Sequence, residues 1–161
     1  MTTADPRILH LPNAEATTRF GQHLASLLRP ADLILLHGSI GAGKSHLTRA
    51  AIQALLAEEG RFEDVPSPTF TLVQSYDSAR LGEVIHADLY RLSDPRDLDD
   101  IGLTDALGHS VCLIEWPDLV EVAADLPRLT LRLSPEGEGR QVSVSAIGWE
   151  DRLPALLNPP L

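Results

Sequence analysis

The stretch that decides the fold is residues 33–45, LILLHGSIGAGKS. Residues 33–36 are all apolar, which is typical of a short strand buried on both faces of a sheet. Residues 38–45 match the P-loop pattern G-x-x-x-x-G-K-[ST] without a gap. The residues that follow, 45–58, carry leucine and alanine at helical spacing. A strand, a glycine-rich loop and a helix open an α/β unit, so we predict an α/β fold.

The loop at 38–45 has the composition of a phosphate-binding site. Its glycines permit backbone conformations that turn successive N–H groups toward an anion, and the start of the following helix adds partial positive charge. Lys44 is expected to reach the β- and γ-phosphates, and the Ser45 hydroxyl to bind Mg²⁺. Lys44 is also the only lysine in the chain, beside twelve arginines. A nest that fits one slim ammonium would be crowded by a planar guanidinium, which explains this exception.

Two carboxylates end extended stretches and are candidates for the metal and the attacking water. Glu115 follows the apolar run at 111–114, which has the form of a Walker B strand with Glu in place of Asp. Asp88 ends the stretch at 83–88. Mg²⁺ prefers oxygen ligands, so either carboxylate could hold a metal-bound water or orient the attacking one. Asp88 could instead form an ion pair with Arg91.

Other residues near these positions have structural explanations. His86 shares a strand face with Asp88, but no cluster of histidines or cysteines accompanies it, which favours a hydrogen-bonded structural histidine over a metal ligand. Cys112 lies within an apolar run, which favours the core over a nucleophile. Trp116 could equally pack in the core or cover the site. Residues 67–69, SPT, are by themselves only typical turn residues.

The remaining pattern predicts short elements separated by Pro and Gly. We expect a helix at 14–29 with Asn13 as its cap and Pro30 as its stop, a hairpin of the stretches 70–76 and 83–88, one or two short helices within 94–108, a strand at 111–114, and a hairpin of 129–133 and 141–146. This order predicts a P-loop NTPase fold with a mixed central β-sheet, antiparallel additions and flanking helices. Residues 1–161 are expected to form one domain, with a C-terminal tail from about residue 148.

Composition limits the classes of function. The chain has 161 residues, a net charge of −10 and a single cysteine, so a disulfide framework is excluded. Residues 88–125 hold ten acidic residues against two arginines, and such a surface repels a phosphate backbone. A stand-alone nucleic-acid binder is therefore excluded. The start has no signal-peptide pattern and no apolar run approaches the ~20 residues that span a bilayer, so we expect a soluble, cytoplasmic protein with no membrane partner.

Together these residues resemble the TsaE (YjeE) family, the ATPase component of bacterial tRNA threonylcarbamoyladenosine biosynthesis. The resemblance covers nearly all of residues 14–147, and its motifs occur in family order. They are FG at 20–21, the P-loop at 38–45, SPTFTL at 67–72, HADLYRL at 86–92, LIEWP at 113–117 and a late Arg140. The P-loop is generic, whereas the order SPTFTL, HADLYRL and IEW is highly specific.

The resemblance implies an ATP·Mg²⁺ site and a role for each matching residue. Residues expected to bind the nucleotide are Thr17, Ser39, Ile40, Gly41, Ala42, Gly43, Lys44, Ser45, His46, Thr69, Trp116 and Arg140. Ser45 and Glu115 are expected to hold the metal, and the expected catalytic residues are Lys44, Asp88 and Glu115. Thr69 lies on a switch-like loop, and Thr17 and Thr18 fall where family members approach the adenine. The family further implies a weak ATPase that acts with TsaD and TsaB, meeting tRNA only through their complex.

The chain departs from the family pattern at four positions. Relatives usually have an acid at Ser39, threonine at Ser45 and His46, and glycine at Ala50. Serine keeps the hydroxyl that would bind the metal, whereas His46 puts a titratable ring beside the phosphates.

Two other functions fit part of the pattern. A small-molecule P-loop kinase shares the loop and the size, but it should have an arginine-rich lid, and the only candidates, Arg91 and Arg96, lie among acids. A GTPase usually reads guanine with an [NT]-K-x-D loop. Since Lys44 is the only lysine, that loop cannot occur here.

Overall fold

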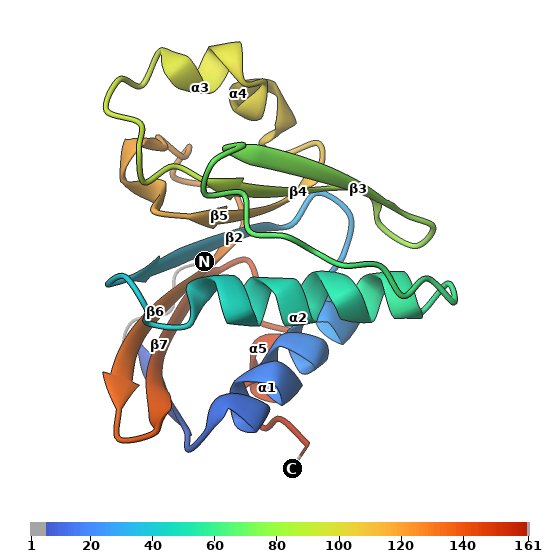
Figure 1. The fold of residues 1–161 in the computed structure, drawn as a ribbon, viewed down its shortest axis with the longest axis vertical. Coiled ribbons are helices and arrows are strands. Elements are labelled where there is room, and N and C mark those ends of the chain that lie inside the picture. Colours follow the sequence, from blue (N-terminus) through green and yellow to red (C-terminus); the bar gives the residue numbers. More distant parts are fainter. Residues whose placement is uncertain (1–5, 161) are drawn as a thin grey trace.

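The computed structural model describes residues 6–160, which form one seven-stranded sheet covered by helices on both faces (Figure 1). The strands are β1 (Arg7–Leu11), β2 (Leu33–Gly38), β3 (Val73–Ser78), β4 (Gly82–Asp88), β5 (Val111–Glu115), β6 (Arg128–Glu136) and β7 (Gly139–Ile147). Their order across the sheet is β1-β7-β6-β2-β5-β4-β3. The four central strands β6, β2, β5 and β4 are parallel, and the outer pairings are antiparallel. The predicted mixed sheet is therefore confirmed.

The helices divide between the two faces. On one face lie α1 (Ala14–Leu27), α2 (Lys44–Ala57) and α5 (Leu153–Leu156), and on the other lie α3 (Asp97–Asp100) and α4 (Leu103–Ala106) (Figure 1). A 3-10 turn, η1 (Pro117–Leu119), follows β5. None of the helices within residues 6–160 combines the length and the apolar character that crossing a bilayer requires.

The apolar run that opens β2 serves two separate cores. Ile34 and Leu36 pack in the cluster under α1 and α2, whereas Leu33 and Leu35 pack in the cluster under α3 and α4. Successive strand side chains point to opposite faces, so a strand covered on both sides must be apolar at every position. Burial on both faces holds β2 in a fixed place, and β2 leads directly into the P-loop.

Several predicted boundaries differ from the observed ones, and for two of them a local contact gives the reason. Asn13 caps α1 as predicted, accepting a hydrogen bond from the Ala16 N–H at 2.8 Å, but the helix ends at Leu27 because Leu28 is already extended. The stretch from Phe70 was expected to be extended, yet β3 begins only at Val73. The reason is a turn in which the Leu72 N–H donates to the Pro68 carbonyl at 2.7 Å, with Leu72 at φ 69°.

The sequence did not predict β1, and it predicted a C-terminal tail from about residue 148. β1 pairs with β7 at the edge of the sheet, and its residues alternate too weakly to identify it without that partner. The C-terminal segment packs against the core through Trp149 and Leu156, both buried. Arg152 anchors it, because its guanidinium binds both oxygens of the buried Asp32 carboxylate at 2.5 and 3.0 Å.

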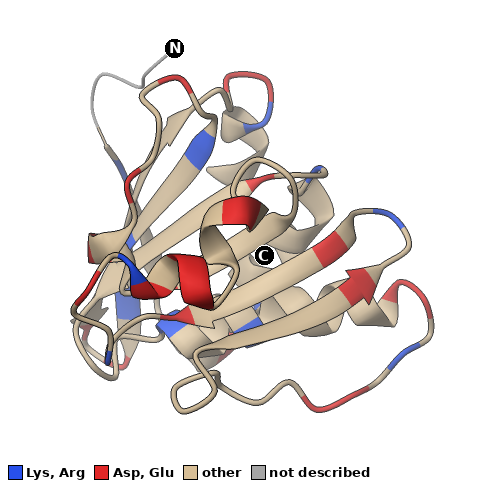
Figure 2. Cartoon of the chain, turned by 90° about the horizontal axis from the view of Figure 1, so that it is seen from above, with Lys and Arg blue, Asp and Glu red and all other residues tan. Residues whose placement is uncertain are grey.

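Acidic residues mark both α3 and α4, as well as several strands and loops seen from that side (Figure 2). Asp97, Asp99 and Asp100 lie on α3, and Asp105 lies on α4. The P-loop lies between β2 and α2, so it contains none of these acidic residues.

Candidate functional site

The P-loop runs from the end of β2 to the first turn of α2, and two of its glycines are required by close packing. A Cβ atom on Gly38, whose φ is +149°, would lie 2.6 Å from the carbonyl oxygen of Leu133 on β6. A Cβ on Gly43, whose φ is +101°, would lie 2.9 Å from Nε of Arg140 on β7. Gly38 therefore packs directly against β6, and at both glycines the positive φ is a backbone conformation that L side chains rarely adopt.

A pocket of about 430 Å³ opens beside this loop and gathers most of the predicted residues. Its lining consists of Ile40, Gly41, Ala42, Gly43, Lys44, Ser45, His46, Thr69, Asp88, Tyr90, Glu115, Trp116 and Arg140. Sequence reasoning missed Tyr90 as a lining residue, although its place two residues after Asp88 could have indicated it. Ser39 and Thr17 do not line this pocket. Thr17 is buried on α1 and borders a separate small cavity with Gly43 and His46.

Lys44 is held inside the site. Its ammonium donates to the carbonyl oxygen of Gly38 and, at 3.0 Å, to that of Ser39. It also lies 3.9 Å from the centre of the Trp116 ring, a cation–π distance. Burial lowers the pKa of Lys44, and the carboxylates of Glu115 and Asp88 oppose that shift. The result is a poorly hydrated positive charge beside the loop, which favours an anionic ligand.

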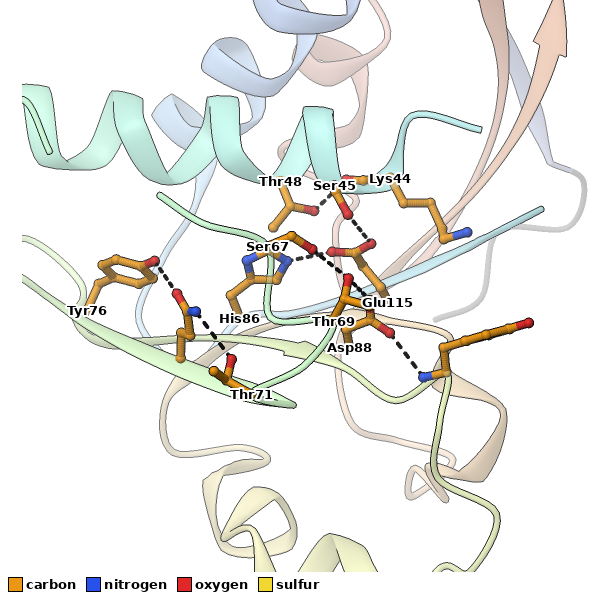
Figure 3. A network of polar contacts seen from close by, with 12 residues as sticks. Lys44, Ser45, Thr48, Ser67, Thr69, Thr71, Tyr76, His86, Asp88 and Glu115 are labelled. Atoms are coloured by element: carbon orange, nitrogen blue, oxygen red, sulfur yellow. Dashed lines mark hydrogen bonds and ion pairs between the residues drawn. The ribbon is translucent and has the colours of Figure 1, made fainter. Parts of the chain in front are cut away.

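Ser45, Glu115 and His86 form a chain of hydrogen bonds that leads from the pocket lining to the buried His86 (Figure 3). The Ser45 hydroxyl donates to Oε1 of Glu115 at 2.7 Å, and Nε2 of His86 lies 2.6 Å from Oε2 of the same carboxylate. Glu115 ends β5, and Asp88 stands opposite it in the parallel register of β4 and β5. Both candidate carboxylates therefore meet at the same edge of the sheet, as expected for the carboxyl ends of parallel strands. His86 is a buried, hydrogen-bonded histidine, as predicted.

Asp88 is bound to the loop that contains the SPT sequence (Figure 3). The Thr69 hydroxyl donates to Oδ2 of Asp88 at 3.2 Å, and the Tyr90 N–H donates to Oδ1 at 3.0 Å. Since Thr69 gives its only proton to Asp88, the Ser67 hydroxyl must donate to Thr69, 2.8 Å away. Arg91, the alternative partner of Asp88, instead donates to the Phe70 carbonyl at 2.8 Å.

The structure also shows where Trp116 and Cys112 lie. Trp116 covers the site: it lines the pocket, and its ring lies 4.7 Å from that of Tyr90. The backbone of Trp116 leaves the strand direction with a φ of 56°, and its backbone N–H donates to the carbonyl of Leu36 on β2. Cys112 is in the core, as predicted. Burial raises the pKa of its thiol to about 12, so the nucleophilic thiolate is disfavoured.

His46 on α2 and Arg140 on β7 also line the pocket. Nε2 of His46 and Oγ1 of Thr18 are hydrogen-bonded at 2.6 Å, and both residues also line a neighbouring cavity of about 430 Å³. Arg140 donates to the Gly41 carbonyl at 3.2 Å. Its Nε is buried and has no hydrogen-bond partner within residues 6–160, so a donor remains beside the P-loop.

The oxygen ligands near the loop suit Mg²⁺ better than a transition metal. Ser45 offers a hydroxyl and Glu115 a carboxylate, both hard oxygen donors. In the part of the chain that the structure describes, no group of three or more His, Cys, Asp or Glu side chains is arranged to hold a metal. Mg²⁺ commonly takes one or two protein ligands and completes its shell with water and phosphate oxygens, so this donor set fits it.

The seven-stranded mixed sheet, with a P-loop between a central parallel strand and a helix, defines an α/β protein built around a P-loop. The family model for the threonylcarbamoyl adenosine biosynthesis protein TsaE matches residues 11–155. The chain belongs to the TsaE family.

Relatives and a solved structure agree with this membership. The tRNA threonylcarbamoyladenosine biosynthesis protein TsaE of Bacillus subtilis is 33% identical over 138 residues, which cover 84% of this chain and 83% of that protein. The protein of the same name from Haemophilus influenzae is 40% identical over 116 residues, which cover 68% of this chain and 70% of that protein. The crystal structure of YdiB from Bacillus subtilis shares the fold, with a TM-score of 0.66, 24% identity, and coverage of 98% of this chain and 94% of that one.

Proposed function

We propose that this protein binds ATP with Mg²⁺ and hydrolyses it as a subunit required for threonylcarbamoyladenosine modification of tRNA, acting with TsaD and TsaB. The observation that carries the proposal is the convergence of Lys44, Ser45 and Glu115 on one pocket beside the P-loop. Family membership supports the pathway, because the relatives carry the name of this modification.

The triphosphate would lie along the loop between Gly38 and Ser45. Backbone N–H groups and the start of α2 favour its negative charge, and Lys44 supplies the neutralising ammonium. To reach the phosphates, Lys44 exchanges its bonds to the carbonyls of Gly38 and Ser39 for bonds to phosphate oxygens. The adenosine end would extend past His46 toward Thr18 and Thr17, along the cavities that share His46.

Ser45 and Glu115 would hold Mg²⁺, which when bound neutralises charge on the phosphate oxygens. Asp88 stands opposite Glu115 across the β4–β5 pair and is the second acid of the site. Each of its oxygens accepts one hydrogen bond and keeps capacity for another, so Asp88 can orient a water molecule. Glu115 has the same capacity. Thr69 connects Asp88 to the 67–72 loop, so movement of that loop would change the orientation of the acid.

The residues in the pocket explain why activity alone should be weak. Lys44 and Arg140 are the cations that line it, and Arg140 is already bound to the Gly41 carbonyl. Transition-state charge on the outer phosphate therefore meets little additional positive charge from the lining. We expect TsaD and TsaB to raise the rate by completing or closing the site.

The tests are nucleotide binding, partner binding and tRNA modification. Calorimetry should detect ATP·Mg²⁺ with preference over GTP, and Lys44→Ala should abolish the uptake. In a strain depleted of the natural protein, Lys44→Ala and Glu115→Ala should lose modification, whereas Glu121→Ala, an exposed acid outside the pocket, should retain it. Nucleotide-dependent co-purification with TsaD and TsaB is expected. Intact modification with both site variants would refute the proposal, and phosphoryl transfer to a metabolite would favour the kinase alternative.

A further inference from the structure

Both oxygens of the Glu115 carboxylate, at the end of the buried strand β5, are held by side chains. Oε1 accepts the Ser45 hydroxyl at 2.7 Å, and Oε2 lies 2.6 Å from Nε2 of His86. The side chain of His86 is fully buried and that of Glu115 is 2% exposed. His86 does not line the pocket, so it touches the site only through Glu115.

The proton that joins His86 to Glu115 lies on the histidine. An ionised carboxylate carries no hydrogen, so in the bond between Oε2 of Glu115 and Nε2 of His86 the hydrogen stands on Nε2. Nδ1 of His86 is buried and has no hydrogen-bond partner within residues 6–160. A ring with its hydrogen on Nε2 leaves only a lone pair at Nδ1, which avoids burying a second N–H without an acceptor.

This arrangement fixes the direction of the Ser45 lone pairs. Because the Ser45 hydrogen points at Oε1 of Glu115, the lone pairs of its oxygen point away from the carboxylate, and Ser45 lines the pocket. A hydroxyl that binds a metal must present lone pairs and place its hydrogen on another acceptor. The orientation of Ser45 therefore depends on the orientation of Glu115, which depends in turn on His86.

The supports of this chain are strands rather than loops. His86 lies on β4 and Glu115 on β5, and the parallel register pairs Asp88 with Glu115, two residues beyond His86. Side chains two residues apart on a strand share a face, so His86 and Asp88 both face the Glu115 side of the sheet. Little movement of the backbone is available to replace the histidine contact once it is removed.

We infer that His86 is a positioning residue that holds Glu115, and through it Ser45, in the orientation needed to bind Mg²⁺ with the nucleotide. This inference rests on the proposed function. Contacts that orient metal ligands in this way commonly contribute about 10–100-fold to metal affinity. They contribute much less to the affinity for those parts of the nucleotide that the metal does not contact.

The test compares the substitutions His86→Gln and His86→Asn, whose side-chain amides differ in how far they extend toward Glu115. The Gln nitrogen can occupy the place of Nε2, whereas the Asn nitrogen corresponds to Nδ1 and falls short of Glu115. His86→Asn should raise the Mg²⁺ concentration for half-maximal ATP binding by about 10–100-fold, while ATP affinity in EDTA stays near that of the wild type. His86→Gln should restore most of the Mg²⁺ response. His109→Asn, at an exposed histidine outside the site, is the matched control.

The outcomes separate the role of His86 from the proposed binding of ATP with Mg²⁺. If wild-type protein binds ATP with a Mg²⁺ response and His86→Asn leaves that response unchanged, or if Gln and Asn behave alike, the inference is overturned and the proposed function stands. If the wild type takes up no ATP, both are overturned. Should His86→Asn fail to fold, nitrogen NMR of labelled histidine in the wild type decides: the Nε2–H tautomer of His86 supports the inference, and the Nδ1–H tautomer refutes it.

Discussion

Arg152→Ala tests whether the C-terminal segment is part of the folded domain. In the structure, Arg152 and Asp32 are 6% and 8% exposed, and the guanidinium binds both carboxylate oxygens. Arg152 also donates to the Leu27 carbonyl and stacks 3.7 Å from the centre of the Trp149 ring. Removing it leaves a buried carboxylate without its counter-ion, directly before β2.

The expected magnitude follows from that geometry. Deleting one partner of a buried ion pair costs about 3–5 kcal/mol. A domain of this size loses roughly 2–4 °C of Tm for each kcal/mol, so Tm should fall by roughly 6–20 °C. Since the P-loop lies at the other end of β2, ATP affinity well below Tm should stay near that of the wild type.

The assay is thermal unfolding followed by circular dichroism, with an exposed ion pair as control. Arg29 and Asp151 lie 2.8 Å apart, and their side chains are 56% and 60% exposed. Exposed pairs contribute little to stability because water and salt screen them, so Asp151→Asn should leave Tm nearly unchanged. If Arg152→Ala lowers Tm no more than Asp151→Asn does, the buried Arg152–Asp32 ion pair does not stabilise the domain as expected.

Three further predictions concern the site and the core. Gly43→Ala should strongly weaken ATP binding in calorimetry, because an L side chain rarely adopts the φ of +101° found at Gly43, and its Cβ would also displace the Arg140 side chain, whose Nε lies 2.9 Å away; ordinary affinity would show that the loop can adjust. Thr69→Val removes the hydroxyl that donates to Asp88, so the ATPase rate should fall by roughly 2–10-fold with ATP affinity unchanged, and an unaltered rate would exclude Thr69 from orienting Asp88. Cys112 should resist alkylation in mildly alkaline buffer and react after unfolding, because burial raises its pKa from 9.0 to about 12. The same shift makes stability fall as pH rises from 9.0 toward 12, since the unfolded thiol ionises first; rapid labelling of the folded protein would contradict this.

The P-loop and the two carboxylates could be predicted because each is a local pattern. Residues 33–45 contain the apolar strand, the glycine turn and the lysine in one stretch, and the structure places them as β2, loop and α2. Glu115 ends an apolar run and Asp88 ends an extended stretch, so their place at a strand end follows from the sequence. Their roles in catalysis stay a prediction.

The turn at Leu72 and the edge strand β1 could not be predicted, for two different reasons. Phe70 to Leu72 has the residue types of a strand, but a hydrogen bond from Leu72 to Pro68 and a positive φ take it out of the sheet. β1 is mostly exposed and gains its identity only by pairing with β7, more than a hundred residues away. In both cases the deciding interaction lies outside the pattern of the segment itself.

The α/β class, the P-loop and the acids at the strand ends could be predicted from the sequence alone, because strand burial, glycine conformation and helix starts are local properties of the chain. The folded structure was needed to show that His86 is hydrogen-bonded to Glu115, that the Trp116 ring contacts the Lys44 ammonium, and that Arg152 forms an ion pair with Asp32. Each of these contacts joins segments that are distant in the chain. Their pairing depends on the register of parallel strands and on the packing of two cores, which no local periodicity records.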